Sequence, residues 1–202
     1  MTSSTSYMKM DPIFAEQQRF MVRVYNWMAA GLGVTGFMAY YIANSETMTR
    51  IVFGNPIVPI VLIIAQLGLV FWLASSVMRM SASQATGVFI LYAGLTGVTF
   101  SSVFLTYTAS SITSTFMITA GTFGTMSLYG YSTKKDLTSW GSFLIMGLIG
   151  IAIASIVNIF MDSEIMHAMI TYVGVIIFVG LTAYDTQKIK EMNILGNEGT
   201  EE

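Results

Sequence analysis

Six blocks of about 20 mostly apolar residues constrain this fold more than any other feature of the sequence. A helix that rises 1.5 Å per residue needs about 20 residues to cross a hydrocarbon core of about 30 Å. Blocks such as IVPIVLIIAQLGLVFWLA lack the alternation of polar and apolar residues that a membrane-embedded β-barrel requires. The sequence therefore predicts an all-α integral membrane protein with six transmembrane helices, at about 21–43, 56–75, 85–106, 111–131, 140–161 and 165–187.

The connections between these blocks predict a single transmembrane domain over residues 1–202. They are short and contain no Pro/Ser-rich linker and no charge run that would mark a second domain. The first block has no small-residue cleavage site after it, so we expect a retained helix. The chain has no cysteine, which excludes disulfides and thiolate metal sites. A net charge of −2 without a basic cluster argues against nucleic acid as a partner.

The distribution of Lys and Arg predicts the orientation of the chain in the membrane. When loops are assigned alternately to the two sides, eight of the nine basic residues fall on the amino-terminal side and Arg50 falls on the other. By the positive-inside rule, the N-terminus, the loops at Arg79 and Lys134, and the end after Lys190 are cytoplasmic. The outer face is then mildly acidic, because it carries Glu46, Asp162 and Glu164.

Small and neutral polar residues within the blocks are expected to serve helix packing. Four small-residue pairs repeat at i, i+4 and would let helix backbones approach closely: Ala29 with Gly33, Gly97 with Ser101, Ala120 with Gly124, and Gly150 with Ala154. Gln66 and Asn158 are expected to find interhelical hydrogen-bond partners.

A stripe of hydroxyl side chains follows the fourth block. Ser111, Thr115, Thr119, Thr122 and Thr125 are spaced by four, four, three and three residues, so they share one helix face. Such a helix suits the wall of a wet cavity. The alternative is that each hydroxyl bonds back to the carbonyl one turn earlier and needs no other partner. The sequence leaves both readings open.

Asp185, in GLTAYDTQKIK, is a carboxylate close to the end of the last apolar block. A charged residue in a membrane helix costs a few kcal/mol on insertion scales, which favours a functional role. The alternative is an interfacial aspartate that pairs with Lys188. An acid near a helix C-terminus opposes the macrodipole unless the helix continues to Gly196.

Asp185 also continues a partly polar face, which contains Thr171, Gly174, Phe178 and Thr182. This face is expected to point toward other helices, where partial desolvation of a carboxylate favours its protonation. His167, on the same block, has no Cys or second His near it and is expected to be an interfacial polar residue rather than a metal ligand.

Two stretches carry a family resemblance: GLTAYDTQKIK, and TFGTMSLYGYSTKKDLTSWGSFLIMGLIGIAIASIVNIF at 122–160. They resemble the bacterial branch of the Bax inhibitor-1 family, also called the transmembrane Bax inhibitor motif family. The resemblance implies a bacterial inner-membrane protein with six helices around a central seventh, and a pH-sensitive calcium leak. It also implies that the aspartate of the YDTQ motif, here Asp185, pairs with a second aspartate on the last helix as proton sensor and gate.

The chain departs from the family pattern because it ends at GNEGTEE, where the family has a link and then the central helix. We expect a chain that is truncated or one that functions without this helix. Small residues such as Gly174, Gly180 and Gly97 would then face unfilled space or water. A latch arginine at the end of the second helix is also implied, and Arg79 is the basic residue nearby.

The expected function is a pH-sensitive calcium leak channel gated through Asp185 and Arg79, with a cavity lined by Thr182, Thr115, Thr119 and Thr122. Asp185 would form a weak calcium site, since calcium prefers several oxygen ligands. Calcium is the transported ion, no cofactor is expected, and the partners are the lipid bilayer and calcium ions.

An alternative is a membrane-embedded regulator that binds other membrane proteins, such as cell-death regulators or a membrane protease. An enzyme is not expected, because the blocks hold no paired acidic residues suited to acid/base chemistry.

Overall fold

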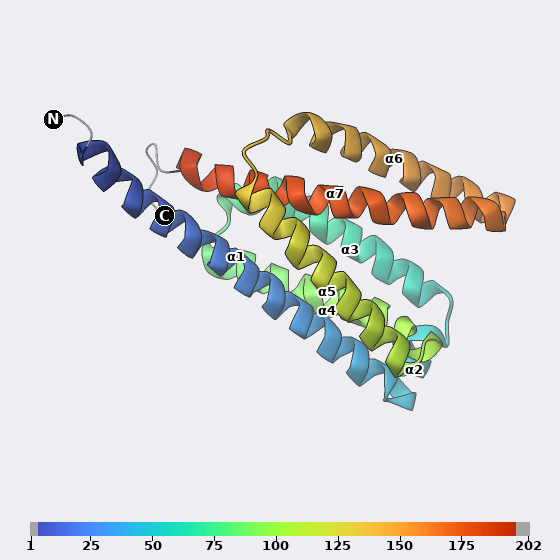
Figure 1. The fold of residues 1–202 in the computed structure, drawn as a ribbon. Coiled ribbons are helices and arrows are strands. Elements are labelled where there is room, and N and C mark those ends of the chain that lie inside the picture. The colour runs from blue at the N-terminus through green and yellow to red at the C-terminus, as the bar shows by residue number, and fades with distance from the viewer. Residues whose placement is uncertain (1–3, 197–202) are drawn as a thin grey trace. The chain divides into compact units, whose positions relative to one another are not determined.

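The computed structural model describes the backbone from Ser4 to Gly196, and the side chains from Ala15 to Met192 apart from Met78. All regular elements in this part of the chain are helices, as the apolar blocks predict (Figure 1). The elements are α1 (Ser4–Ala43), α2 (Glu46–Phe53), α3 (Ile57–Ser76), the 3-10 turn η1 (Val77–Arg79), α4 (Ala82–Thr106), α5 (Ala109–Ser132), α6 (Thr138–Met161) and α7 (Glu164–Gly196).

Four of these helices are long and apolar enough to cross a membrane, by length and composition: α3, α4, α6, and α7 as far as Met192. The remaining two predicted spans lie in α1 and α5, which are long but less apolar. Polar residues explain the difference, because α5 is rich in Ser and Thr and α1 combines Asn26 with glycines and tyrosines. The apolar character of the described helices therefore supports four spans, and the predicted count of six goes beyond it.

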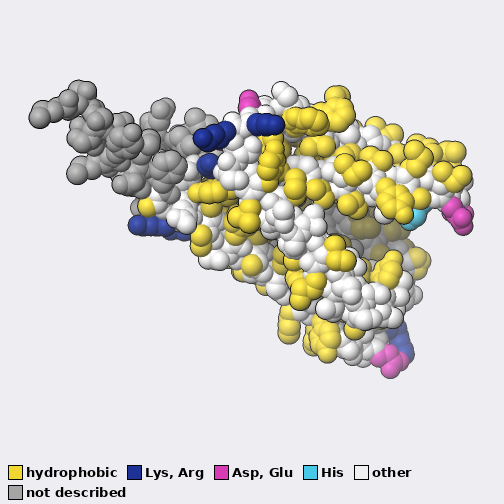
Figure 2. All heavy atoms as spheres, in the orientation of Figure 1, with side chains coloured by type: hydrophobic (Ala, Val, Ile, Leu, Met, Phe, Trp, Pro, Cys, Tyr) yellow, Lys and Arg dark blue, Asp and Glu magenta, His cyan; other side chains and the backbone are white. Residues whose placement is uncertain are grey.

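The side chains of the apolar helices are mostly exposed, as expected of helices that face lipid. No residue of α3 is buried, and the buried residue of α6 is Gly141. Figure 2 shows hydrophobic side chains spread over α6 and α7, with charged side chains near the two ends of this pair. A water-soluble protein would not leave such apolar surface uncovered.

The chain divides into two compact units, which we describe separately: Val22–Ser114, and Met1–Met21 together with Thr115–Glu202. We call them the α3–α4 unit and the α6–α7 unit. That residues 1–202 form a single domain stays a prediction.

In the α3–α4 unit, a glutamine links two helices. The Gln66 amide of α3 donates to Thr99 Oγ1 of α4 at 2.6 Å and accepts from Thr96 Oγ1 at 3.4 Å. The prediction that Gln66 finds an interhelical partner is confirmed. A hydroxyl also joins α1 to α4, because Thr35 Oγ1 donates to Ala93 O at 2.9 Å.

Close approach of α1 and α4 depends on Gly97. A Cβ atom at this position would lie 2.5 Å from Thr35 O and 2.7 Å from Met38 Cβ, so the space beside Gly97 is filled. Ser101, one turn later, is fully buried. The packing role predicted for this small-residue pair is confirmed, and the expectation that Gly97 faces unfilled space is wrong. The other three pairs include Gly33, Gly124 and Gly150, which have no such neighbour within 4 Å.

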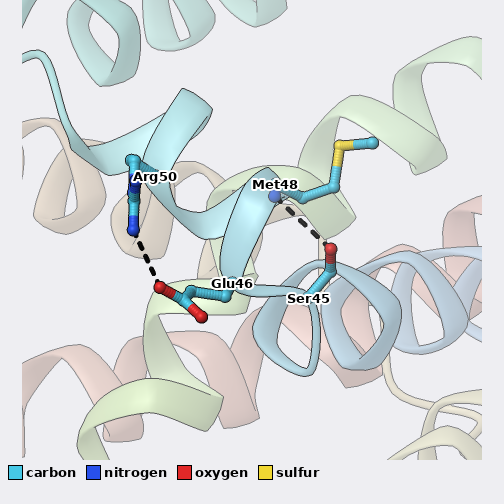
Figure 3. A network of polar contacts seen from close by, with 4 residues as sticks. All are labelled: Ser45, Glu46, Met48 and Arg50. Carbon is cyan, nitrogen blue, oxygen red and sulfur yellow. Dashed lines mark hydrogen bonds and ion pairs between the residues drawn. The ribbon is translucent and has the colours of Figure 1, made fainter.

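The short helix α2 begins with a side-chain cap, in which Ser45 accepts from Met48 N at 3.4 Å (Figure 3). Arg50 and Glu46 form an ion pair of 2.8 Å one turn apart. Both side chains are largely exposed, so this pair contributes little to stability. It does neutralise Glu46 locally, which leaves Asp162 and Glu164 as the predicted source of the acidic outer face.

In the α6–α7 unit, α6 and α7 run side by side (Figure 1). The turn between them contains Asp162, whose φ of 48° lies in the left-handed region. Asn158 Oδ1 accepts from Ser163 N at 3.1 Å in this turn. The prediction of an interhelical partner for Asn158 is therefore wrong, because the amide stabilises the turn instead. Gly180 packs against Leu144 Cδ1, which a Cβ atom would approach to 2.7 Å, so the expectation of unfilled space at Gly180 is also wrong.

Candidate functional site

The candidate site lies in the α6–α7 unit, where α5 crosses α7. At the crossing, a Cβ atom on Gly130 would collide with the backbone oxygen of Ala183. Both residues are buried, and their small size lets the two helix backbones touch. This contact fixes one point of the α5–α7 interface.

Next to the crossing, the unit contains a cleft of about 590 Å³. Its α7 wall extends from Ile170 to Thr182, a length of about 18 Å at 1.5 Å per residue. The lining is mostly apolar with four threonines: Ile118, Thr119, Thr122, Phe123, Ile151, Ile170, Thr171, Gly174, Val175, Phe178, Val179 and Thr182. Hydroxyl groups from two helices therefore face one cavity, which we call the threonine cleft.

Three of the four residues predicted to line a cavity lie in the threonine cleft, and one does not. Thr119, Thr122 and Thr182 lie in the wall of the threonine cleft, whereas Thr115 does not. The expectation of open space at Gly174 is confirmed, since a Cβ atom there would meet a single side chain, Ile151, at 3.8 Å. A role of these residues in a conducting pore stays a prediction.

Three of the four hydroxyls of the threonine cleft bond to a carbonyl oxygen of their own helix. Thr122 donates to Ile118 O at 2.9 Å, Thr171 to His167 O at 2.9 Å, and Thr182 to Phe178 O at 2.8 Å. Back-bonding and cavity lining thus occur together, so the two readings of the hydroxyl stripe do not exclude each other. A hydroxyl that donates its proton keeps lone pairs that can accept. The cleft therefore offers neutral oxygen ligands and no charge.

Asp185 lies on the same face of α7, one turn beyond the threonine cleft. It follows Thr182 by three residues and Phe178 by seven, which are the spacings of one helix face. Its side chain is exposed, and it makes no hydrogen bond or ion pair with any residue that the structure describes. Because α7 continues to Gly196, the carboxylate is not at the C-terminus of the helix.

The alternative role of Asp185, a surface ion pair with Lys188, is not what the structure contains. In the part of the chain that is described, the ion pair within 4.0 Å joins Arg50 and Glu46. Lys188 Nζ instead lies over the Tyr184 ring, 5.7 Å from its centroid, in a cation–π arrangement. The Asp185 carboxylate is thus free to meet a ligand or a proton.

Sequence reasoning missed the role of Gln187, two residues after Asp185. This side chain is buried, with 8% exposed, and both ends of its amide bond to one loop. Its Oε1 accepts from Leu137 N at 2.9 Å, and its Nε2 donates to Lys135 O at 2.9 Å. A glutamine two residues after an intramembrane aspartate was a visible signal, but its partners are backbone atoms that no sequence pattern identifies.

Lys190 and Gln17 extend this polar contact region. Lys190 Nζ donates to Tyr131 O at 2.9 Å, near the end of α5, and lies 4.8 Å from the centroid of the Tyr131 ring. Gln17 of α1, itself buried, donates from Nε2 to Lys190 O at 3.2 Å. The Lys190 end of α7 is therefore attached both to α5 and to α1.

The loop between α5 and α6 is ordered by an acidic side chain as well. Asp136 Oδ1 accepts from Thr138 N at 2.8 Å at the start of α6. Hydrogen bonds from the Thr138 side chain and backbone lower the pKa of the Asp136 carboxyl from its ordinary value of 3.8.

Two further predictions concern Arg79 and metal binding. Arg79 ends η1 with an exposed side chain and belongs to the α3–α4 unit, whereas Asp185 belongs to the α6–α7 unit. Across the described residues, no three His, Cys, Asp or Glu side chains gather where they could hold a metal ion. A calcium site at Asp185 would thus need backbone, hydroxyl or water oxygens as further ligands.

The fold and the site together define a class. Long, exposed apolar helices and a hydroxyl-lined cleft are the features of an integral membrane protein of the helical-bundle class. Residues 17–199 match the family described as inhibitor of apoptosis-promoting Bax1, and the chain belongs to this Bax inhibitor-1 family. The family expected from the sequence is therefore confirmed.

Several bacterial relatives are similar along most of their length. The chain is 54% identical to the inner membrane protein YbhL of Escherichia coli K12, over 87% of this chain and 75% of that protein. It is 45% identical to an uncharacterized protein of Borreliella burgdorferi, over 92% and 80% respectively. The uncharacterized protein RP147 of Rickettsia prowazekii is 44% identical, over 90% and 77%. No solved structure matches the chain. The relative from Escherichia coli and the apolar helices support a place in the bacterial inner membrane.

Proposed function

We propose that this protein is a calcium leak channel of the inner membrane, in which α7 carries the ion path and Asp185 responds to pH. The observation that carries the proposal is the threonine cleft, whose α7 face continues to Asp185. Six helices cross the membrane in this proposal, with α1 and α5 completing the bundle.

The chemistry of this face of α7 suits the passage of calcium ions better than their tight binding. Calcium prefers six to eight oxygen ligands, and tight sites supply several carboxylates. The threonine cleft supplies neutral hydroxyl oxygens, and Asp185 supplies one carboxylate beyond it. An ion that binds weakly also leaves readily, which conduction requires. Protonation of Asp185 would remove the charged ligand and so couple the leak to pH.

Further roles follow the family resemblance. Arg79 acts as the latch arginine in this proposal, and Thr115 lines the path beyond the threonine cleft. Both termini are cytoplasmic, because eight of nine basic residues fall on that side when six spans are counted. The proposal involves no enzymatic step and no cofactor, and calcium is the transported ion.

A second candidate is a regulator that binds other membrane proteins. The family description favours it, because it names an inhibitor of Bax1. Calcium entry into liposomes that contain the purified protein alone separates the two functions, since no partner protein is present there.

The threonine cleft can be tested by filling it. Gly174→Leu places a side chain into the cleft, where a Cβ atom at position 174 would lie 3.8 Å from its neighbour, Ile151 Cδ1. We expect calcium entry to fall toward that of empty liposomes. The matched control is Gly121→Leu on α5, since a Cβ atom at Gly121 meets nothing within 4 Å. Wild-type calcium entry in Gly174→Leu, with the folded protein verified, would contradict the proposed path.

A further inference from the structure

The buried amide of Gln187 makes a contact that the proposed ion path does not use. Leu137 N donates to its Oε1 and its Nε2 donates to Lys135 O, both at 2.9 Å. Because both ends of the primary amide bond to one loop, residues 133–137, these bonds fix the direction of the Gln187 side chain as well as its distance from the loop. Rotation of α7 by one residue, about 100°, would break both bonds at once.

Two other contacts lie on the same face of α7. Ala183, Gln187 and Lys190 are spaced by four and three residues, so they form one stripe along the helix. Ala183 touches Gly130, and Lys190 Nζ donates to Tyr131 O at 2.9 Å. All three residues of the stripe therefore contact α5 or the loop that follows it.

Asp185 points away from this stripe. It lies two residues from both Ala183 and Gln187, a rotation of about 200° around the helix axis. The exposure pattern agrees, because Gln187 and Thr186 are buried while Asp185 is exposed. The direction of the Asp185 side chain is thus set by the contacts on the opposite face of α7.

We propose that Gln187 is a positioning residue, which fixes the rotation of α7 against the 133–137 loop and thereby presents Asp185 on the face that continues the threonine cleft. Lys190 supports this attachment one turn further along. The consequence for calcium passage rests on the proposed function, whereas the orientation of Asp185 does not.

Because these 202 residues contain no cysteine, the proposal can be tested directly by introducing single cysteines. Single cysteines are introduced as Asp185→Cys or Thr186→Cys, and a soluble maleimide measures their reaction rates. In the parent protein we expect fast labelling at position 185 and slow labelling at position 186, which is 3% exposed. Adding Gln187→Met removes both amide bonds at similar side-chain length. The labelling rate at position 186 should then rise about thirtyfold, the effect of losing two hydrogen bonds of ordinary net strength.

Gln66→Met is the matched control, because it also removes two amide hydrogen bonds but lies in the α3–α4 unit. It should leave the labelling at positions 185 and 186 unchanged. The proposal is overturned if Gln187→Met leaves position 186 protected, or if Gln66→Met exposes it equally, since the effect would then be general destabilisation.

A measurement on the parent protein keeps the proposal falsifiable if Gln187→Met does not fold. The Leu137 amide should exchange its hydrogen slowly, because it donates to a buried side chain. Exchange as fast as in an open loop would contradict the attachment.

Calcium flux separates this inference from the proposed function. If labelling responds to Gln187→Met while Asp185→Asn leaves the flux unchanged, the channel proposal fails and the positioning role stands. If Asp185→Asn abolishes the pH response while labelling is insensitive to Gln187→Met, the positioning role fails and the channel proposal stands. If both proposals hold, Gln187→Met should also weaken the pH response of the calcium flux, and Gln66→Met should not.

Discussion

At the residue scale, glycines at helix contacts differ sharply from glycines on open faces. Gly130 and Gly97 each lie against a backbone oxygen of another helix, which cannot move aside as the end of a flexible side chain can. Gly141 and Gly31 lie against the rings of Tyr184 and Phe89. The sequence places glycines in each of the long helices, but the neighbouring atom decides which of these glycines the fold requires.

Gly130→Ala should therefore destabilise the protein. The added methyl group would collide with Ala183 O, so α5 and α7 must separate, at a cost of about 1–3 kcal/mol. Part of this is offset by the better helix propensity of alanine, about 1 kcal/mol. The melting temperature in detergent should fall for Gly130→Ala and not for the control Gly121→Ala, whose surroundings are open. Equal melting temperatures for the two variants would show that α5 and α7 do not touch at Gly130.

The candidate site could be predicted from the sequence only in part, for a physical reason. Asp185 is recognisable because a carboxylate within an apolar helix is costly, and Thr182, Thr119 and Thr122 follow from helical spacing. The function of Gln187 depends on Leu137 N and Lys135 O, about 50 residues earlier in the chain. Backbone donors and acceptors exist at nearly every residue, so the sequence does not reveal which of them a side chain reaches.

At the element scale, the long helices were predictable and the short ones were not. Apolar length determines a membrane helix, so α3, α4, α6 and α7 agree with the predicted ranges to within a few residues, apart from the extension of α7 to Gly196. The short elements α2 and η1 have too few residues for a periodic signal. The predicted span 21–43 covers only the second part of α1, because its first part carries charges such as Glu16 and Arg19.

The start of α6 should respond to acid through Asp136. Since hydrogen bonds from Thr138 lower the pKa of Asp136 in the folded protein, its contribution to stability is present above the ordinary value of 3.8. That contribution is lost as the pH falls through the lowered pKa. Between about pH 6 and about pH 3, the melting temperature of the wild type should therefore fall more than that of Asp136→Asn. Parallel curves for the two proteins would contradict a stabilising role of the ionised carboxylate.

At the scale of the whole molecule, membership of the Bax inhibitor-1 family and the apolar helices define a membrane protein. In the α6–α7 unit, the threonine cleft, Asp185 and the Gln187 contacts follow one another along α7. The proposed leak channel assigns a task to each of them. In these proposals the threonine cleft would admit the ion, Asp185 would titrate, and Gln187 would hold the helix in the rotation that joins the two.

The most direct test of this account is the initial rate of calcium entry into liposomes, measured against pH for the wild type and Asp185→Asn side by side. We expect a rate that changes with pH in the wild type and a rate that does not in the variant, which keeps the shape of the side chain but cannot ionise. Lys188→Gln should keep a rate that changes with pH, because Asp185 can still ionise and no ion pair within 4.0 Å joins Lys188 to it in the described part of the chain. A wild-type pH profile in Asp185→Asn would contradict the account.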